Sequence, residues 1–238
     1  MTNGLYNESH AEFIKQQKHA APAEARTLRF GEAVSLLNVQ PRTESNIDKA
    51  YEIFEEIIKA NPDDDFALEA RYMQGRIDQV QRPTPDLAKA EATFAELFAK
   101  HPTHLVGQRA LVKLAIIRLY APVDAAERRR RYDELNLAAE KITDPGIIVQ
   151  IHLLLGEVAR RVNYGTAEEL KHYLAAEKAG VVKRRLLGDV YIRIADLARL
   201  EGKKDIAIDY YTRFLEQFPR TDRRTTIEGY LADLNSSK

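Results

Sequence analysis

Apolar residues recur every three or four positions along most of the chain, which places them on one face of an α-helix. One such stripe is formed by Phe66, Ala70, Met73 and Ile77, and another by Tyr132, Leu135, Ala139 and Ile142. The strict alternation typical of strands is nearly absent, and the prolines fall at breaks between helical patterns. The pattern therefore predicts an all-α protein.

Three of the predicted helices have nearly the same sequence. In 50–62, 90–102 and 207–219, an alanine comes first, an aromatic residue follows four positions later, and an apolar pair comes next. A proline closes each stretch at the same offset. Such internal repetition indicates a stack of similar helical units, each of which hides its apolar face on its neighbours.

Capping and helix-breaking residues divide the chain into helix pairs. The N-cap signals are Thr84 before Pro85, Asp144 before Pro145, Asp124 with Glu127, and Thr166 with Glu169. The predicted pairs are 23–40 with 46–60, 64–80 with 85–100, 104–120 with 124–142, 145–163 with 166–179, and 182–201 with 204–218. A single helix over 222–234 follows the last pair.

The stretch 188–221 resembles a complete tetratricopeptide repeat. The family's pattern of aromatic, small and apolar residues and a closing proline is met by Tyr191, Ala195, Ala198, Ala207, Tyr211, Phe214 and Pro219. Small residues let the two helices of a pair approach closely, and the aromatic fills the space against the next pair. In earlier first helices, Gly31, Gly75 and Gly156 supply the small position, so the likeness covers roughly 24–219.

This resemblance implies an all-α right-handed superhelix, a solenoid of about five tetratricopeptide-like antiparallel helix pairs plus a C-terminal capping helix. We expect an N-terminal extension at 1–22, a repeat domain at 23–221, and a capping helix and tail at 222–238. The extension has no strong apolar stripe, and its Phe13 and Ile14 are candidates to dock on a partner or on a neighbouring copy.

The resemblance also implies a partner-binding groove, because the first helices of such arrays line one side of the stack. The matching positions here are Gln150, Leu153, Glu157, Arg160 and Arg161 in one repeat, and Asp189, Ile192, Asp196, Arg199 and Leu200 in the next. This mixture of apolar and charged side chains favours a peptide or a helical segment as ligand. Ordinary solvated surface is the alternative interpretation for each residue.

Composition and motifs reduce the number of function classes that the sequence allows for this protein. Lys plus Arg and Asp plus Glu both number 36, and this zero net charge argues against a generic polyanion binder. With no cysteine, the chain has no disulfide, thiolate metal site or cysteine nucleophile. Phosphate-binding and zinc-peptidase motifs are missing too, so the sequence predicts a protein that is not an enzyme and has no cofactor, metal site or catalytic residue.

Several polar residues are of types found in metal-binding, catalytic or nucleic-acid-binding sites, but each has a simpler interpretation. His101 and His104 are expected in a solvated loop, and Glu169 and His172, half of a di-iron motif, are expected on the surface. His152 is expected to be partly buried and bonded to a neighbour. The run Arg128–Arg131 points in four directions around its helix and is partly compensated by nearby acids, so we expect a solvated helix face.

Together these observations predict a non-enzymatic scaffold that binds a peptide or helical segment of a protein partner, within a larger assembly. One alternative is a self-associating structural protein, a homo-oligomer joined through 105–120 or 222–234. A weaker alternative is nucleic-acid binding through the Arg-rich helix 124–142 and 183–185. No apolar run predicts a transmembrane segment. We expect a cytoplasmic protein, or a bacterial periplasmic or envelope protein if an export signal was removed.

Overall fold

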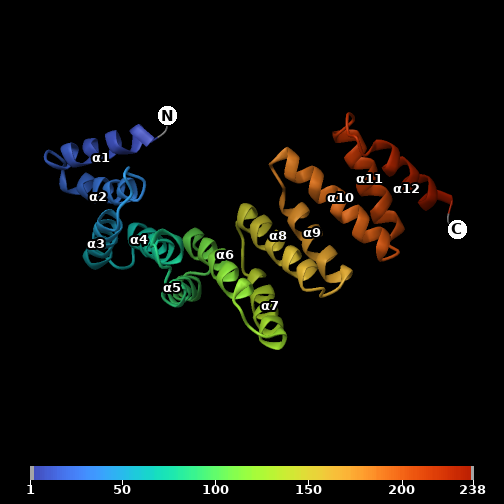
Figure 1. Cartoon of the computed structure of the whole chain (residues 1–238), viewed down its shortest axis with the longest axis horizontal. Coiled ribbons are helices and arrows are strands. Elements are labelled where there is room, and N and C mark those ends of the chain that lie inside the picture. The colour runs from blue at the N-terminus through green and yellow to red at the C-terminus, as the bar shows by residue number, and fades with distance from the viewer. Residues whose placement is uncertain (1–2, 237–238) are drawn as a thin grey trace. The chain divides into compact units, whose positions relative to one another are not determined.

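The computed structural model describes residues 3–236, and every regular element in that range is a helix (Figure 1). The all-α prediction is therefore confirmed. The helices form two compact units, the first ending at Tyr120 and the second beginning at Ala121. Within each unit, consecutive helices pack one on the next, as they do in a helical-repeat solenoid.

Over residues 3–120, the first unit contains six α-helices and one π-helical turn. They are α1 (Asn3–Gln17), α2 (Pro22–Leu36), α3 (Glu44–Ala60), α4 (Asp65–Arg76), η1 (Ile77–Gln81), α5 (Leu87–Lys100) and α6 (Leu105–Tyr120). The predicted pairs α2 with α3 and α4 with α5 are present, and α6 packs against α5. The turn η1 continues α4 without a break, so the predicted helix 64–80 changes its winding near its end.

The second unit, described over residues 121–236, contains the other six α-helices. They are α7 (Ala125–Ala139), α8 (Pro145–Arg161), α9 (Thr166–Ala179), α10 (Arg184–Leu200), α11 (Lys204–Gln217) and α12 (Arg224–Ser236). The predicted pairs α8 with α9 and α10 with α11 are present, and α9 also packs on α10. The predicted pair 104–120 with 124–142 spans the boundary, since α6 belongs to the first unit and α7 to the second.

Two of the predicted N-caps are confirmed and two are wrong. Asp124 and Asp144 accept hydrogen bonds from the amides that open α7 and α8. Helix α5 begins at Leu87 and is capped by Asp86 rather than by Thr84, while Thr166 is already the first helical residue of α9, behind Gly165. The predicted cap lies two residues before the true cap in α5 and one residue after it in α9, an error of the size usual for helix ends.

The three repeated helices are equivalent in the structure. Their first alanines, Ala50, Ala90 and Ala207, are all 0% exposed. The aromatic residues that follow, Phe54, Phe94 and Tyr211, are also buried, and the helices end two residues before the closing proline. The residues that recur in the three sequences therefore occupy equivalent packing positions in the structure.

The N-terminal segment forms helix α1, which packs on α2. The ring of Phe13 lies against Gly31, where an added Cβ would come within 2.5 Å of a ring carbon. His10 Nδ1 lies 3.1 Å from Ser35 Oγ, and Gln17 donates a 2.9 Å hydrogen bond to Glu32. Phe13 thus occupies space inside the first unit, whereas Ile14 is exposed.

Within residues 3–236, no helix combines the length and the apolar character that crossing a bilayer requires.

Candidate functional site

Helices α10 and α11 show the packing that the repeat pattern requires. The small residues Ala195, Ala198 and Ala207 are 0% exposed, and the Tyr211 ring lies among them in the core of the second unit. On the preceding pair, Gly156 of α8 makes room for the Tyr173 ring of α9, because an added Cβ would stand 3.0 Å from a ring carbon. These close contacts fix α8 and α10 on the two sides of α9.

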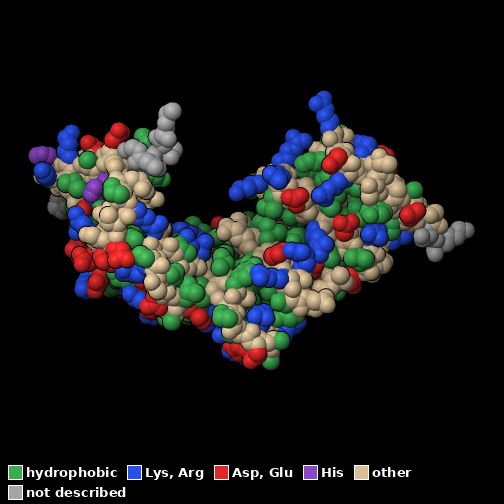
Figure 2. Space-filling model, in the orientation of Figure 1, with side chains coloured by type: hydrophobic (Ala, Val, Ile, Leu, Met, Phe, Trp, Pro, Cys, Tyr) green, Lys and Arg blue, Asp and Glu red, His purple; other side chains and the backbone are tan. Residues whose placement is uncertain are grey.

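A groove of about 400 Å³ runs between the two first helices, α8 and α10. Its lining residues are Leu153, Glu157 and Arg160 from α8, Tyr173 from α9, and Leu186, Asp189, Val190 and Arg193 from α10. In the face drawn in Figure 2, hydrophobic side chains lie between these helices and charged side chains of both signs surround them. An apolar centre with charged edges is the usual composition of a peptide-binding surface.

The charged side chains of the groove are held in place by ion pairs. Arg193 donates two hydrogen bonds, of 2.6 and 2.7 Å, to the two carboxylate oxygens of Glu169. Glu169 is buried, and its hydrogen bond raises the pKa of Arg193 above its ordinary value. On the opposite helix Arg160 pairs with Glu157 at 2.7 Å. The guanidinium groups are therefore oriented before any ligand arrives.

Some of the predicted groove residues line the groove in the structure, and the others do not. Leu153, Glu157, Arg160 and Asp189 line the groove, whereas Gln150 and Arg161 are exposed on α8 outside its lining. Ile192 belongs to the core and is 8% exposed, and Leu200 is 62% exposed near the end of α10.

Asp196 and Arg199 face other helices of the second unit. Asp196 accepts a 2.5 Å hydrogen bond from the Tyr211 hydroxyl of α11, and the Arg199 guanidinium lies 4.4 Å from the ring centroid of Tyr230 on α12.

Four lining residues, Tyr173, Leu186, Val190 and Arg193, were not predicted. Leu186, Asp189, Val190 and Arg193 follow the three- and four-residue spacing of one helical face, so the signal was present in the sequence. The predicted set began at Asp189 and ran to Leu200, and so it lay too far towards the end of α10. Tyr173 could have been found as the aromatic that the small Gly156 admits.

A buried polar chain connects α7, α8 and α9. His172 Nε2 lies 2.7 Å from the Tyr132 hydroxyl, and His172 Nδ1 lies 2.9 Å from His152 Nδ1. Burial lowers the pKa of both histidines, and the positive charge that His152 would carry lowers that of His172 further. The prediction that His152 is bonded to a neighbour is confirmed.

The prediction that Glu169 and His172 lie on the surface is wrong, since they are 2% and 0% exposed. The physical reason is the position of α9 between α8 and α10, which buries polar as well as apolar faces of that helix.

The other polar residues singled out in the sequence have ordinary partners. Arg129 pairs with Asp133 at 2.9 Å, and both Arg130 and Arg131 pair with Glu127 at 2.7 Å. His104 lies 3.3 Å from the Asp65 carboxylate. In the described part of the chain, no group of three or more His, Asp or Glu side chains is placed to hold a metal ion.

Comparison with known proteins gives a family match and a structural likeness. The model of the tetratricopeptide repeat matches residues 189–221, and no curated protein matches the chain. A solved structure, a thermophilic tetratricopeptide-repeat protein of Thermus thermophilus, is 19% identical with a TM-score of 0.47, covering 88% of this chain and 98% of that one. The family match and the buried repeat positions of α10 and α11 show that residues 189–221 form one tetratricopeptide repeat.

Proposed function

We propose that this chain is a non-catalytic scaffold that binds a peptide or a helical segment of a partner protein in the groove between α8 and α10. Tetratricopeptide-repeat chains are in general protein-interaction scaffolds rather than enzymes, and residues 189–221 match that family. The observation that carries the proposal is the lining of the groove, in which Leu153, Tyr173, Leu186 and Val190 lie among two arginines and two acids.

In the proposed mechanism, the groove already has its binding shape before the ligand arrives, and the ligand docks on this preformed surface. Apolar anchors of the ligand would pack on Leu153, Leu186 and the Tyr173 ring, where displacing water is favourable. Arg160 and Asp189, at the edges, would fix direction and register through hydrogen bonds and charge. Because Glu169 already holds Arg193, little side-chain entropy is lost on binding.

Selection from a random peptide library displayed on phage, followed by calorimetry with the selected synthetic peptides, tests this proposal. We expect peptides with spaced apolar anchors and one binding site per chain. Leu186→Asp should weaken their binding at least tenfold, because it introduces a charge into the apolar centre of the groove.

Leu200→Asp is the matched control, since Leu200 is an exposed leucine on the same helix that does not line the groove. Its peptide affinity should equal that of the unmodified chain. Equal weakening by both variants would place the contact elsewhere on α10, and selection of no peptide at all would remove the groove as a recognition site.

A further inference from the structure

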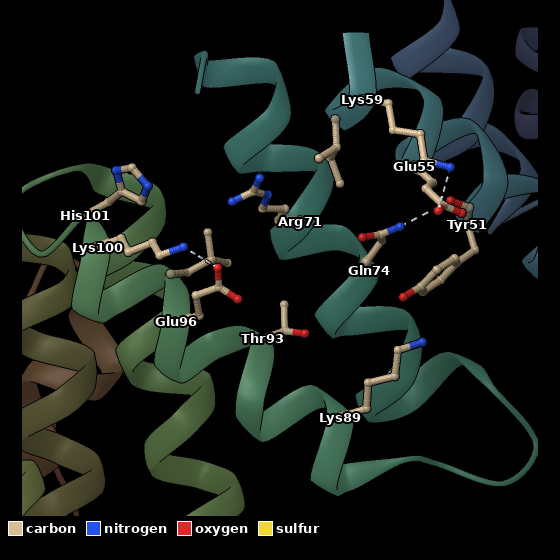
Figure 3. A pocket seen from close by; sticks show the side chains of 12 residues that line it. Tyr51, Glu55, Lys59, Arg71, Gln74, Lys89, Thr93, Glu96, Lys100 and His101 are labelled. Atoms are coloured by element: carbon tan, nitrogen blue, oxygen red, sulfur yellow. Dashed lines mark hydrogen bonds and ion pairs between the residues drawn. The ribbon is translucent and has the colours of Figure 1, made fainter. Parts of the chain in front are cut away.

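The first unit has a hollow on the side formed by its second helices. Its walls come from α3 and α5, its floor comes from α4, and its volume is about 570 Å³. Figure 3 shows polar and charged side chains from all three helices around it. The groove described above differs in position, since it lies between first helices and belongs to the second unit.

Positive charge exceeds negative charge around this hollow. The lining includes the cations Lys59, Arg71, Lys89 and Lys100 but only two carboxylates, those of Glu55 and Glu96. Glu55 is paired with Lys59 at 2.9 Å, and Glu96 with Lys100 at 2.7 Å. In a chain of zero net charge, the lining has a surplus of two positive charges, one of which, that of Lys89, is paired with the Asp78 carboxylate outside the lining.

Arg71 supplies one of these charges from the floor of the hollow. It is half-buried on α4, and among the described residues it has no hydrogen-bond or ion-pair partner. Figure 3 places its guanidinium in the space between α3 and α5. A guanidinium offers five N–H donors, so those of Arg71 are available to an acceptor that enters the hollow.

Lys89 and Tyr51 form the opposite end of the hollow. The Lys89 ammonium lies 4.4 Å from the centroid of the Tyr51 ring and 3.4 Å from the buried carboxylate of Asp78. Hydrogen bonding to Tyr51, with the Asp78 charge, raises the pKa of Lys89 above its ordinary value. This cation is therefore fixed in position, beside an aromatic face that apolar parts of a ligand can contact.

The spacing of the cations indicates the length of the ligand. Lys89 and Lys100 lie on one helix, and at a rise of about 1.5 Å per residue they are separated by about 16 Å along it. A single phosphate or a small carboxylate is too short to contact both ends. An extended peptide, at about 3.3 Å per residue, covers the distance with about five residues.

The two carboxylates favour a peptide over a nucleic acid. Glu55 and Glu96 stand in the wall between the cations, and the sugar-phosphate backbone of a DNA strand has no N–H donor that could pair with them. A peptide carries N–H groups between its side chains, and these donors can pair with the same carboxylates.

We propose that the hollow formed by α3, α4 and α5 is a second docking site, which binds a short extended acidic segment of a protein. Arg71 takes a carboxylate at the centre of the hollow. Lys59, Lys100 and Lys89 attract further carboxylates at its ends.

Fluorescence anisotropy on the full chain, with a fluorescein-labelled hexaglutamate peptide as the probe, tests this proposal. We expect saturable binding that weakens as NaCl is raised from about 0.05 to about 0.3 M, because salt screens exposed charges. A labelled hexaserine peptide should not bind. Absence of hexaglutamate binding at low salt would overturn the proposal, as would binding of a six-residue oligothymidylate that is as tight as that of hexaglutamate.

Arg71→Gln should weaken hexaglutamate binding about tenfold, the loss expected for one charge-assisted contact. Lys100→Gln, at an exposed position, gives a second variant that does not disturb the half-buried floor and should weaken binding severalfold. Arg223→Gln, on the exposed surface of the second unit, is the control and should bind as the unmodified chain does. Unchanged affinity in folded Arg71→Gln and Lys100→Gln, checked by circular dichroism, would refute the assignment.

Discussion

At the scale of single residues, size decides where the helices of this chain come together. Gly75 admits the Phe94 ring, since an added Cβ would come within 2.8 Å of it, and Gly156 admits Tyr173 in the same way. Ala195 has the same role in the clearest repeat, where its side chain is 0% exposed within the core of the second unit. A larger side chain at such a position must displace a neighbouring helix or ring.

Ala195→Leu should therefore lower the free energy of unfolding by roughly 1–3 kcal/mol through overpacking. Urea unfolding followed by circular dichroism measures the change. Ala167→Leu, at an exposed position of α9, is the matched control and should alter stability by less than about 0.5 kcal/mol. Equal stability of the Ala195 variant and the unmodified chain would show that Ala195 is not a helix-contact position.

The buried histidines predict a dependence of stability on pH. Burial lowers the pKa of His152 and His172 below the ordinary value of 6.5. Of the charged neighbours, Lys171 lowers the pKa of both, while Glu168, 3.4 Å from His172 Nε2, partly opposes the shift of His172. The unfolded chain therefore takes up protons before the folded chain does, and the folded state loses stability as pH falls below about 6.5.

We expect the free energy of unfolding of the unmodified chain to fall by on the order of 2–3 kcal/mol between pH 7 and pH 4.5. In the His172→Gln variant the free energy of unfolding should fall by less over the same pH range. Urea unfolding at several pH values measures both slopes. His19→Gln, which changes an exposed histidine, should keep the slope of the unmodified chain. If His172→Gln kept the full slope as well, the buried pair would not be its source.

At the scale of elements, the ends of the helices are fixed by particular side chains. Asp86 Oδ1 accepts a 3.0 Å hydrogen bond from the Lys89 amide at the start of α5. The Asp86 amide in turn donates a 2.9 Å hydrogen bond to the Asp78 carbonyl in η1. These two hydrogen bonds set the direction in which the chain leaves η1 and enters α5. Asp86, rather than the Thr84 predicted from the local sequence, is therefore the N-cap of α5.

Asp86→Ala should destabilise the chain by about 1 kcal/mol, the usual loss when a helix cap is removed. Thr84→Ala is the internal control and should have almost no effect, because Thr84 lies outside the helix and its cap. Thermal unfolding followed by circular dichroism compares the two variants. A larger loss from Thr84→Ala would reverse the assignment of the cap.

Helix α12 covers the end of the second unit. Ile227 is 2% exposed, and the Tyr230 ring lies 5.7 Å from that of Tyr211, centroid to centroid. Ile227→Ala should reduce the free energy of unfolding by about 2–5 kcal/mol, because it opens a cavity under the helix. Thr226→Ala, one residue earlier and exposed, should change little. Denaturant unfolding distinguishes them, and a neutral Ile227 variant would mean that α12 does not shield the core.

At the scale of the whole molecule, each unit has a core of its own. The first is built around Ile53, Phe54 and Ile77, and the second around Tyr191, Ile194 and Tyr211. Each unit also carries one of the two proposed binding surfaces. The acidic-segment site lies in the first unit, and the peptide groove lies in the second. A chain with two such surfaces has what a scaffold needs to hold two segments at once.

Neither proposed surface needs a second copy of the chain, so we expect a monomer of 27.1 kDa in solution. Size-exclusion chromatography with light scattering measures the mass. A mass of twice that value, independent of concentration, would favour the self-associating alternative, and substitutions on the exposed faces of α6 or α12 would then locate the contact.

The sequence by itself determined the helices from α2 onward, most of their ends and the repeat, because periodicity, capping and small-residue spacing act over a few neighbouring positions. Leu153, Glu157, Arg160 and Asp189 could be predicted for the groove from the resemblance to the tetratricopeptide repeat, whose first helices line such a groove. Only the tertiary structure decided that Glu169 holds Arg193, that Phe13 fills the space at Gly31, and that His172 is buried. Each of these depends on which helix packs against which, a contact between residues far apart in the chain that no local pattern records.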